Sequence, residues 1–188
     1  MKAVLGLNAK CAKCPELVKS RKLYPWGKPV WGFGSKKSPV VFIGEAPGKN
    51  GCGSTGIPFY GDRSGDLFQA CLAESGILMK SVYTTNIIKC CPKDNRTPTA
   101  VEVSNCRKWL DMELAKVAPQ IIITLGGMAL NFFAPERKLM TSVGTAFAWC
   151  DYIVVPYYHP AYALRIGASA QYKKDFKILL EIWGEHAL

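Results

Sequence analysis

Acidic residues, long apolar stretches and histidine are all scarce in this sequence. Its 188 residues include 14 Asp and Glu against 24 Lys and Arg, which gives a formal net charge of +10. Such an excess suits a polyanionic partner, nucleic acid first and an anionic membrane second, although a basic protein that binds neither fits as well. No apolar run approaches the roughly 20 residues of a membrane span, and residues 1–10 make too short an apolar stretch for a signal peptide. We therefore expect an intracellular protein without a membrane segment.

Internal repeats and linker-like segments are also missing, as is the Gly-Lys-Ser/Thr pattern of a phosphate-binding loop. With 49% hydrophobic residues, the chain is able to bury a core of ordinary size. We expect a single domain over residues 1–188. The missing loop and the positive charge together disfavour an enzyme that acts on free nucleotides, which is one alternative for such a fold.

Four apolar stretches predict buried strands that alternate with helices. The strands are expected at residues 40–43, 82–88, 121–125 and 153–155. Helices are expected from a cap at Asp62 or Ser64 to residue 75, from a capping box of Thr99 and Glu102 to residue 117, after residue 127, and at 172–183. Residues 15–39 are expected to form an irregular loop. The alternation favours a three-layer α/β/α fold around a central four-stranded parallel sheet.

The carboxyl ends of these strands carry turn-forming and polar residues. The first strand stops at Gly44 and continues as Glu45-Ala46-Pro47-Gly48, and the later strands lead to Asn86, to Gly126-Gly127 and to His159. Ligands of open α/β sheets bind beyond the carboxyl ends of the strands, so we expect these residues to share one site. Each has a simpler interpretation when taken singly, since Asn86 could cap a turn and His159 could be a structural histidine.

Eight cysteines in a chain expected to be intracellular favour a metal site or buried thiols over disulfides. Cys11 and Cys14 form a C-x2-C pair, and Cys90 and Cys106 follow much later in the chain. Four thiolates contributed in this way are able to close a site for zinc or for an iron–sulfur cluster, and the residues alone do not choose between the two. Scattered buried thiols are a further interpretation, and Cys91 is a rival to Cys90.

Several segments resemble the iron–sulfur uracil-DNA glycosylases, and the likeness runs over nearly the whole chain. Residues 44–48 and 57–61 are similar to the first motif and the pocket segment of the type-4 enzymes, residues 85–90 and 95–99 to the middle motif, and residues 159–165 to the last. Residues 29–34 and 61–66 are closer to the type-5 enzymes. Residues 49–54 (Lys-Asn-Gly-Cys-Gly-Ser) stand where type-4 enzymes usually carry an acidic run. The resemblance implies an intermediate of the two types, with a uracil-DNA glycosylase-like fold and a specificity that extends beyond uracil to other deaminated bases.

The reaction that the resemblance implies is hydrolysis of the N-glycosidic bond of a flipped-out nucleotide in DNA. The products are free uracil and an abasic site, as in base excision repair. The resemblance also implies a 4Fe–4S cluster bound by Cys11, Cys14, Cys90 and Cys106. Because these cysteines lie outside the set of strand ends, we expect the cluster to have a structural role. We also expect the protein to be a monomer.

The same resemblance assigns roles to individual residues. Phe59, which could otherwise be a core residue, would stack on the base, Asn86 would read its edge, and His159 would donate to O2 together with backbone N–H groups of Gly44, Ala46 and Gly48. Ala46 stands where type-1 enzymes have an aspartate, so Glu45 or Asp62 would orient the water. The residues expected to contact DNA are Lys89, Asn95, Arg96, Leu164 and Arg165, with Leu164 or Arg165 pressed into the duplex. The alternative is a non-catalytic iron–sulfur or zinc protein that binds nucleic acid, which the missing acidic run favours.

Overall fold

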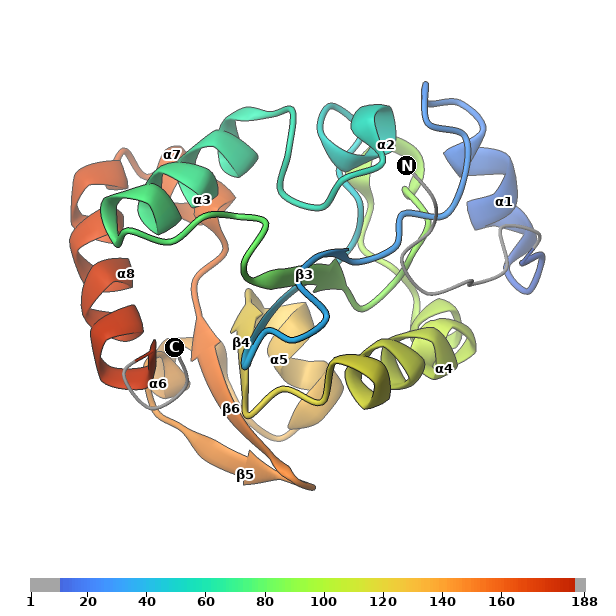
Figure 1. Ribbon diagram of the computed structural model, residues 1–188. Helices are drawn as coiled ribbons and strands as arrows, with labels where there is room; N and C mark the ends of the chain where they lie inside the picture. The colour runs from blue at the N-terminus through green and yellow to red at the C-terminus, as the bar shows by residue number, and fades with distance from the viewer. Residues whose placement is uncertain (1–10, 185–188) are drawn as a thin grey trace.

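The apolar stretches of the sequence form one six-stranded sheet in the computed structural model, which describes residues 11–184 (Figure 1). The strands are β1 (Phe33–Gly34), β2 (Val40–Gly44), β3 (Tyr83–Asn86), β4 (Ile121–Leu125), β5 (Phe147–Trp149) and β6 (Tyr152–Tyr157). Their order across the sheet is β1-β3-β2-β4-β6-β5. The four central strands pair in parallel, which confirms the predicted parallel sheet.

The two edge strands, β1 and β5, are antiparallel to their neighbours and were not predicted. With two and three residues they are too short to carry an alternating pattern. The turn between β5 and β6 passes through Cys150, which has a φ of +50°. A cysteine at this position lacks the Gly or Asn signal that marks most tight hairpins.

The helices lie at both faces of this sheet. Their bounds are α1 (Pro15–Arg21), α2 (Cys52–Thr55), α3 (Arg63–Glu74), η1 (Lys93–Asn95, a 3₁₀ turn), α4 (Ala100–Val117), α5 (Gly127–Phe133), α6 (Leu139–Ser142), α7 (Pro160–Arg165) and α8 (Ser169–Gly184). Asp62 caps α3 by accepting from the backbone N–H of Gly65, and Thr99 and Glu102 form the predicted capping box of α4. The prediction of an irregular loop over residues 15–39 is wrong for α1, which has only seven residues and one deeply buried apolar side chain, Leu17.

Two apolar layers enclose the sheet because successive side chains of each strand point to opposite faces. Val40 and Phe42 of β2 pack with residues of α3, α7 and α8. Val41 and Ile43 pack with residues of α4 and α5 and with Leu17 of α1. Figure 1 shows α3, α7 and α8 gathered on one side of the strands and α4 and α5 on the other, so the three-layer α/β/α prediction is confirmed.

No helix within residues 11–184 is both long and apolar enough to cross a membrane. Residues 1–10, for which a signal peptide was not expected, lie outside the part of the chain that the structure describes.

Candidate active site

The carboxyl ends of β2 and β3 meet at Gly44 and Asn86, which are partners in the parallel ladder. A Cβ atom at position 44 would lie 2.6 Å from Oδ1 of Asn86 and 2.9 Å from Cζ of Phe59. Only glycine fits beneath these two side chains. The predicted base-reading amide and the predicted stacking ring therefore converge over the end of β2.

Phe59 is fixed in place by its neighbours. Its ring centroid lies 4.7 Å from that of Phe68 and 5.8 Å from that of His159. Its φ of +54° places a bulky residue in the left-handed region, which costs on the order of 1 kcal/mol or more. Gln69 Nε2 donates to the carbonyl of Phe59 over 3.1 Å, and the Phe59 backbone lies directly against Gly65 of α3. Backbone strain supported in this way is typical of functional sites.

Asn86 presents a buried donor without an acceptor. Its exposed fraction is 3%, and its amide nitrogen Nδ2 has no hydrogen-bond partner. An unmatched buried polar atom costs about 1–3 kcal/mol and is uncommon in folded proteins. An acceptor on a bound ligand would satisfy it.

His159 caps the N-terminus of α7 with its own side chain, because the backbone N–H of Ala161 donates to Nδ1 over 3.1 Å. Burial lowers the pKa of the imidazole to about 4, and the negative charge of Asp62 opposes this shift only in part. The ring is therefore neutral near pH 7, with its proton on Nε2.

Two cavities meet at His159 and Glu45. One, of about 240 Å³, is lined by residues that include Ala46, Gly48, Asp62 and Asn95. The other, of about 360 Å³, is lined by residues that include Gly126, Met140, Tyr162 and Arg165. Burial raises the pKa of the Glu45 carboxyl, which makes it a better proton acceptor than an exposed carboxylate.

Asp62 is occupied by its capping role. Its Oδ1 accepts from the backbone N–H of Gly65 over 2.8 Å and from the hydroxyl of Ser64 over 2.7 Å. Its Oδ2 lies against the backbone of Gly51. Asp62 and Glu45 are the two carboxylates predicted to orient water. Of these two, only Asp62 is engaged in capping α3.

The prediction that Lys89 contacts a DNA phosphate is wrong. Its side chain is 1% exposed, and Nζ lies 2.6 Å from Oε2 of Glu113, which is 0% exposed. The apolar strand pattern ends just before Lys89, and for that reason the sequence predicts a loop cation there. Its partner lies 24 residues later on α4, and this pairing leaves no signal in the local sequence.

The segment after His159 also differs from the prediction in detail. Leu164 is partly buried and packs against the core, so it is not free to enter a duplex in this conformation. The exposed apolar side chain of the segment is Ile166, at 55%. Arg165 is exposed and its guanidinium lies 5.7 Å from the ring centroid of Tyr162.

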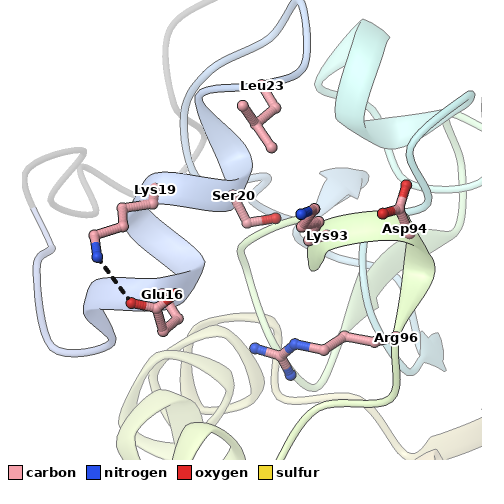
Figure 2. A pocket seen from close by; sticks show the side chains of 7 residues that line it. All are labelled: Glu16, Lys19, Ser20, Leu23, Lys93, Asp94 and Arg96. Atoms are coloured by element: carbon pink, nitrogen blue, oxygen red, sulfur yellow. Dashed lines mark hydrogen bonds and ion pairs between the residues drawn. The ribbon is translucent and has the colours of Figure 1, made fainter.

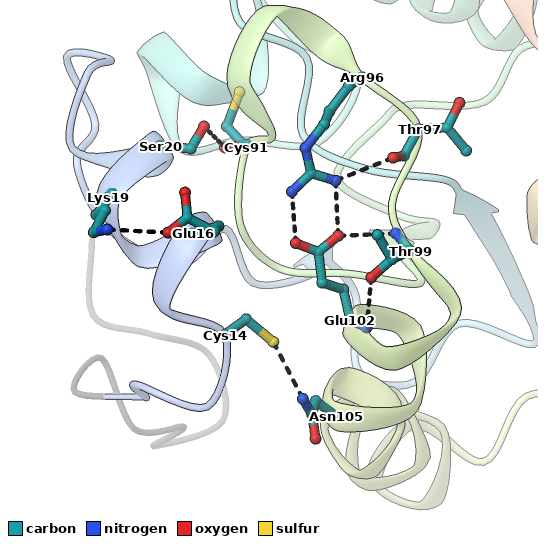
Figure 3. A network of polar contacts seen from close by, with 10 residues as sticks. All are labelled: Cys14, Glu16, Lys19, Ser20, Cys91, Arg96, Thr97, Thr99, Glu102 and Asn105. Atoms are coloured by element: carbon teal, nitrogen blue, oxygen red, sulfur yellow. Dashed lines mark hydrogen bonds and ion pairs between the residues drawn. The ribbon is translucent and has the colours of Figure 1, made fainter.

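Arg96 is held by Glu102 in a two-pronged pair (Figure 3), with 2.6 Å between Nη2 and Oε1 and 2.8 Å between Nη1 and Oε2. Glu102 also accepts from the backbone N–H of Thr99, and the hydrogen bonds from Arg96 lower the pKa of the Glu102 carboxyl. The predicted phosphate contact is therefore partly neutralised by its own neighbour. Asn95 uses its side-chain oxygen to accept from the backbone N–H of Lys49 over 2.8 Å.

Arg96 also lines a third cavity, of about 440 Å³, between α1 and η1 (Figure 2). Lys19 and Lys93 bring further positive charge to this hollow, while Glu16 and Asp94 bring negative charge. The mixture gives no clear preference for one class of ligand.

The four cysteines predicted as cluster ligands come together where α1 meets α4. Cys11 and Cys106 pack beside Trp31 and Trp109, and Cys14, Cys90 and Cys106 border the core layer beneath α4. Two side chains donate to the sulfurs. Arg21 Nη1 donates to Cys90 over 3.2 Å. Asn105 Nδ2 donates to Cys14 over 3.6 Å, as Figure 3 shows.

Within residues 11–184, no group of three or more His, Cys, Asp or Glu is placed to hold a single metal ion. The ligands of a 4Fe–4S cluster each bind a different iron, so they lie farther apart than ligands of one ion. An all-thiol donor set with N–H groups aimed at two of its sulfurs fits such a cluster. Cys91 instead lies against Gly53 of α2, which favours Cys90 over Cys91 as the fourth ligand.

Sequence reasoning passed over three residues that shape these sites. Gly65 gave a usable signal, because a glycine inside a helical pattern often marks a close backbone approach. Glu113 and Arg21 gave none, since each acts on a residue distant in the chain.

Residues 31–184 match the family model described as the uracil DNA glycosylase superfamily. The chain is 38% identical to the type-4 uracil-DNA glycosylase of Thermotoga maritima over 159 residues, and the matched region covers 83% of this chain and 79% of that protein. It is 35% identical over 185 residues to the type-4 uracil-DNA glycosylase of Archaeoglobus fulgidus, with 93% and 89% covered. It is 32% identical over 180 residues to the type-5 uracil-DNA glycosylase of Pyrobaculum aerophilum, with 80% and 78% covered.

Proposed function

The chain belongs to the uracil-DNA glycosylase superfamily, and we propose that it acts in DNA repair as a monomeric, single-domain enzyme that hydrolyses the N-glycosidic bond of a flipped-out deoxyuridine. The observation that carries this proposal is the convergence of Phe59, His159 and the unpartnered amide of Asn86 at the strand ends. Free uracil and an abasic site are the products.

Recognition of the base would begin with Asn86 and Phe59. The unpartnered Nδ2 donates to O4 of uracil, and Oδ1 accepts from N3–H. Cytosine presents a donor and an acceptor in the reverse order, so both contacts become mismatches and buried polar groups stay unpaired. Sites of this kind discriminate by about 10⁴-fold or more. Phe59 stacks on the extruded ring, a contact of about 1–3 kcal/mol in comparable single-strand sites.

Cleavage moves the electron pair of the bond between C1′ and N1 onto the base, while the sugar gains oxocarbenium character. Negative charge collects on O2 of the departing uracil. A neutral His159 with its proton on Nε2 donates to that oxygen, and the contact strengthens as the charge grows. The backbone N–H groups of the turn from Gly44 to Gly48 add to this stabilisation.

Water completes the reaction by adding to C1′ and losing a proton. Glu45 is our choice to orient the water and accept its proton, because it lines both cavities at His159 and its pKa is raised by burial. Asp62 is disfavoured because its Oδ1 is committed to the cap of α3.

The DNA backbone would lie across the rim of the site. Arg165 is our choice for a phosphate contact because it is exposed and lines the 360 Å³ cavity. Ile166 replaces Leu164 as the apolar side chain that enters the space left by the flipped base.

A 4Fe–4S cluster is proposed on Cys11, Cys14, Cys90 and Cys106. When bound, the cluster would link the start of α1, the loop that follows β3 and α4 through its four cysteine ligands. The loop with Cys90 follows Asn86 closely in the chain and leads to α4, so the cluster ligands would support the site without touching the base.

The experiment is cleavage of uracil-containing single- and double-stranded oligonucleotides, followed by hot alkali to break the strand at abasic sites. We expect cleavage by the wild type and strong losses for Asn86→Ala and His159→Ala. Gln171→Ala is the matched amide control, since Gln171 is exposed on α8 and bonds to Asp175. Oligonucleotides with hypoxanthine or xanthine measure whether other deaminated bases are accepted. No alkali-labile site with the wild type would favour the non-catalytic nucleic-acid-binding alternative.

A further inference from the structure

The ion pair of Lys89 and Glu113 is the most deeply buried charged contact in the described part of the chain, and nothing in the proposed chemistry uses it directly. Desolvation of two charges costs several kcal/mol per ion, and an apolar pair of similar volume is often as stable. Stability alone is therefore a weak reason for this pair. A role in fixing the position of the neighbouring backbone is a stronger reason for it.

All three ammonium protons of Lys89 have an acceptor. Nζ lies 2.7 Å from Oγ1 of Thr85, 2.7 Å from the backbone carbonyl of Asn86 and 2.6 Å from Oε2 of Glu113. The hydroxyl of Thr85 in turn donates to Oε2 of Glu113 over 2.6 Å, and the backbone N–H of Gly32 donates to Oε1 over 2.8 Å. The network is closed, and one of its members is the backbone of the residue proposed to read the base.

The backbone on the far side of Asn86 is fixed as well. The N–H of Ile87 donates to the carbonyl of Gly44 over 2.9 Å, and the carbonyl of Lys89 accepts from Val30 over 2.6 Å. The carbonyl of Asn86 is therefore the point at which the ionic network meets the strand end. The buried, unpartnered Nδ2 of Asn86 gains no support from hydrogen bonds of its own. The direction in which Nδ2 points therefore depends on how firmly the backbone of Asn86 is held.

We propose that Lys89 and Glu113 are positioning residues that hold the Asn86 backbone so that its amide meets the edge of uracil. This role rests on the proposed reading of uracil by Asn86. The pair spans from α4 to the end of β3 and acts through Asn86 alone, without contact with the base. Misplacement of a recognition group by about 1 Å is able to cost about 10²-fold in rate.

The test is a coupling experiment under single-turnover conditions with a uracil-containing oligonucleotide. Lys89→Met with Glu113→Leu replaces the pair by apolar side chains of similar size, and is made both in the wild type and in Asn86→Ala. We expect a loss of about 10²-fold in the wild-type background and less than about threefold in Asn86→Ala, because no amide remains to be misplaced. Equal losses in both backgrounds, or no loss in either, would overturn the proposal.

A milder variant, Thr85→Val, removes one hydroxyl of the network and keeps both charges. We expect it to lower cleavage about tenfold in the wild type and by less than about threefold in Asn86→Ala. This variant carries the same test if the double replacement does not fold, as judged by thermal unfolding. Equal losses in its two backgrounds also contradict the proposal.

The matched control is Lys173→Met with Glu74→Leu, which removes an ion pair of the same 2.6 Å length between α8 and α3, with both side chains solvent-accessible. We expect unchanged rates. A wild type that does not cleave uracil would refute the proposed function itself, whereas cleavage without coupling to Asn86 would refute the positioning role only.

Discussion

The backbone N–H of Ala161 donates a hydrogen bond to Nδ1 of His159 over 3.1 Å. An imidazole that accepts at Nδ1 and is neutral carries its proton on Nε2. The start of α7 thus selects the tautomer of the side chain that is proposed to donate to the leaving base. The structural cap and the proposed donor to the leaving base are thus two nitrogens of the same ring.

His159 is expected to stay neutral where an ordinary histidine titrates. Burial lowers its pKa to about 4, so between about pH 4 and about pH 6.5 the unfolded chain binds more protons than the folded one. The stabilisation from this group is complete above about pH 6.5 and is lost as the pH falls toward the folded pKa. Nitrogen-15 NMR of the two histidines measures the titration, with His159→Gln to assign the signals. A His159 signal with its midpoint near the ordinary value would contradict the prediction.

Local signals in the sequence account for much of the fold. The apolar run of β2 and the capping box of Thr99 and Glu102 depend on neighbours along the chain, and both were predicted correctly. The cap of α3 was predicted to be Asp62 or Ser64, and it is Asp62. The convergence of Asn86 and His159 followed from the parallel topology of the sheet.

The predictions that failed concern residues whose positions depend on contacts between segments distant in the chain, or strands too short to show a pattern. The local sequence predicts that Lys89 is a cation in a loop, because its partner Glu113 lies far away in the chain. It also predicts that Leu164 is exposed, because the core residues that Leu164 packs against belong to other elements. The edge strands β1 and β5 are too short for a periodic pattern to exist.

Gly65→Ala tests how the site holds Phe59. Helix propensity alone predicts a gain of about 1 kcal/mol from this change. A Cβ at position 65, however, would lie 2.6 Å from the carbonyl oxygen of Phe59, a backbone atom that is unable to rotate away. We therefore expect the free energy of unfolding to fall by about 1–3 kcal/mol and uracil cleavage to weaken as Phe59 shifts.

Chemical denaturation and single-turnover cleavage provide the two measurements for Gly65→Ala. Asp66→Ala, an exposed change at the next position of α3, is the control and should leave cleavage unaltered. A Gly65→Ala protein more stable than the wild type would mean that the backbone of Phe59 yields freely.

Replacement of single cysteines separates the proposed cluster ligands from the other thiols. Cys90→Ala should lose bound iron, visible absorbance and thermal stability together, because binding of a structural metal site is coupled to folding. Cys91→Ala and Cys150→Ala should retain iron, since Cys91 lies against α2 and Cys150 is exposed in the β5–β6 turn. Retention of iron by Cys90→Ala with its loss from Cys91→Ala would reverse the assignment of the neighbouring thiols.

Replacement of Arg165 and of Arg96, the two arginines that the sequence analysis expects to contact DNA, should change the salt dependence of DNA binding to different extents. Arg165 is exposed, whereas the guanidinium of Arg96 already faces both carboxylate oxygens of Glu102. Release of one counterion per phosphate contact predicts that Arg165→Ala lowers the slope of log K against log salt by about one. Arg96→Ala should change that slope less and should lower stability, because it leaves Glu102 without its partner. Fluorescence anisotropy on uracil-free DNA measures the slopes, and Arg107→Ala on α4 is the control. Equal slope changes for Arg96→Ala and Arg165→Ala would mean that DNA draws Arg96 away from Glu102.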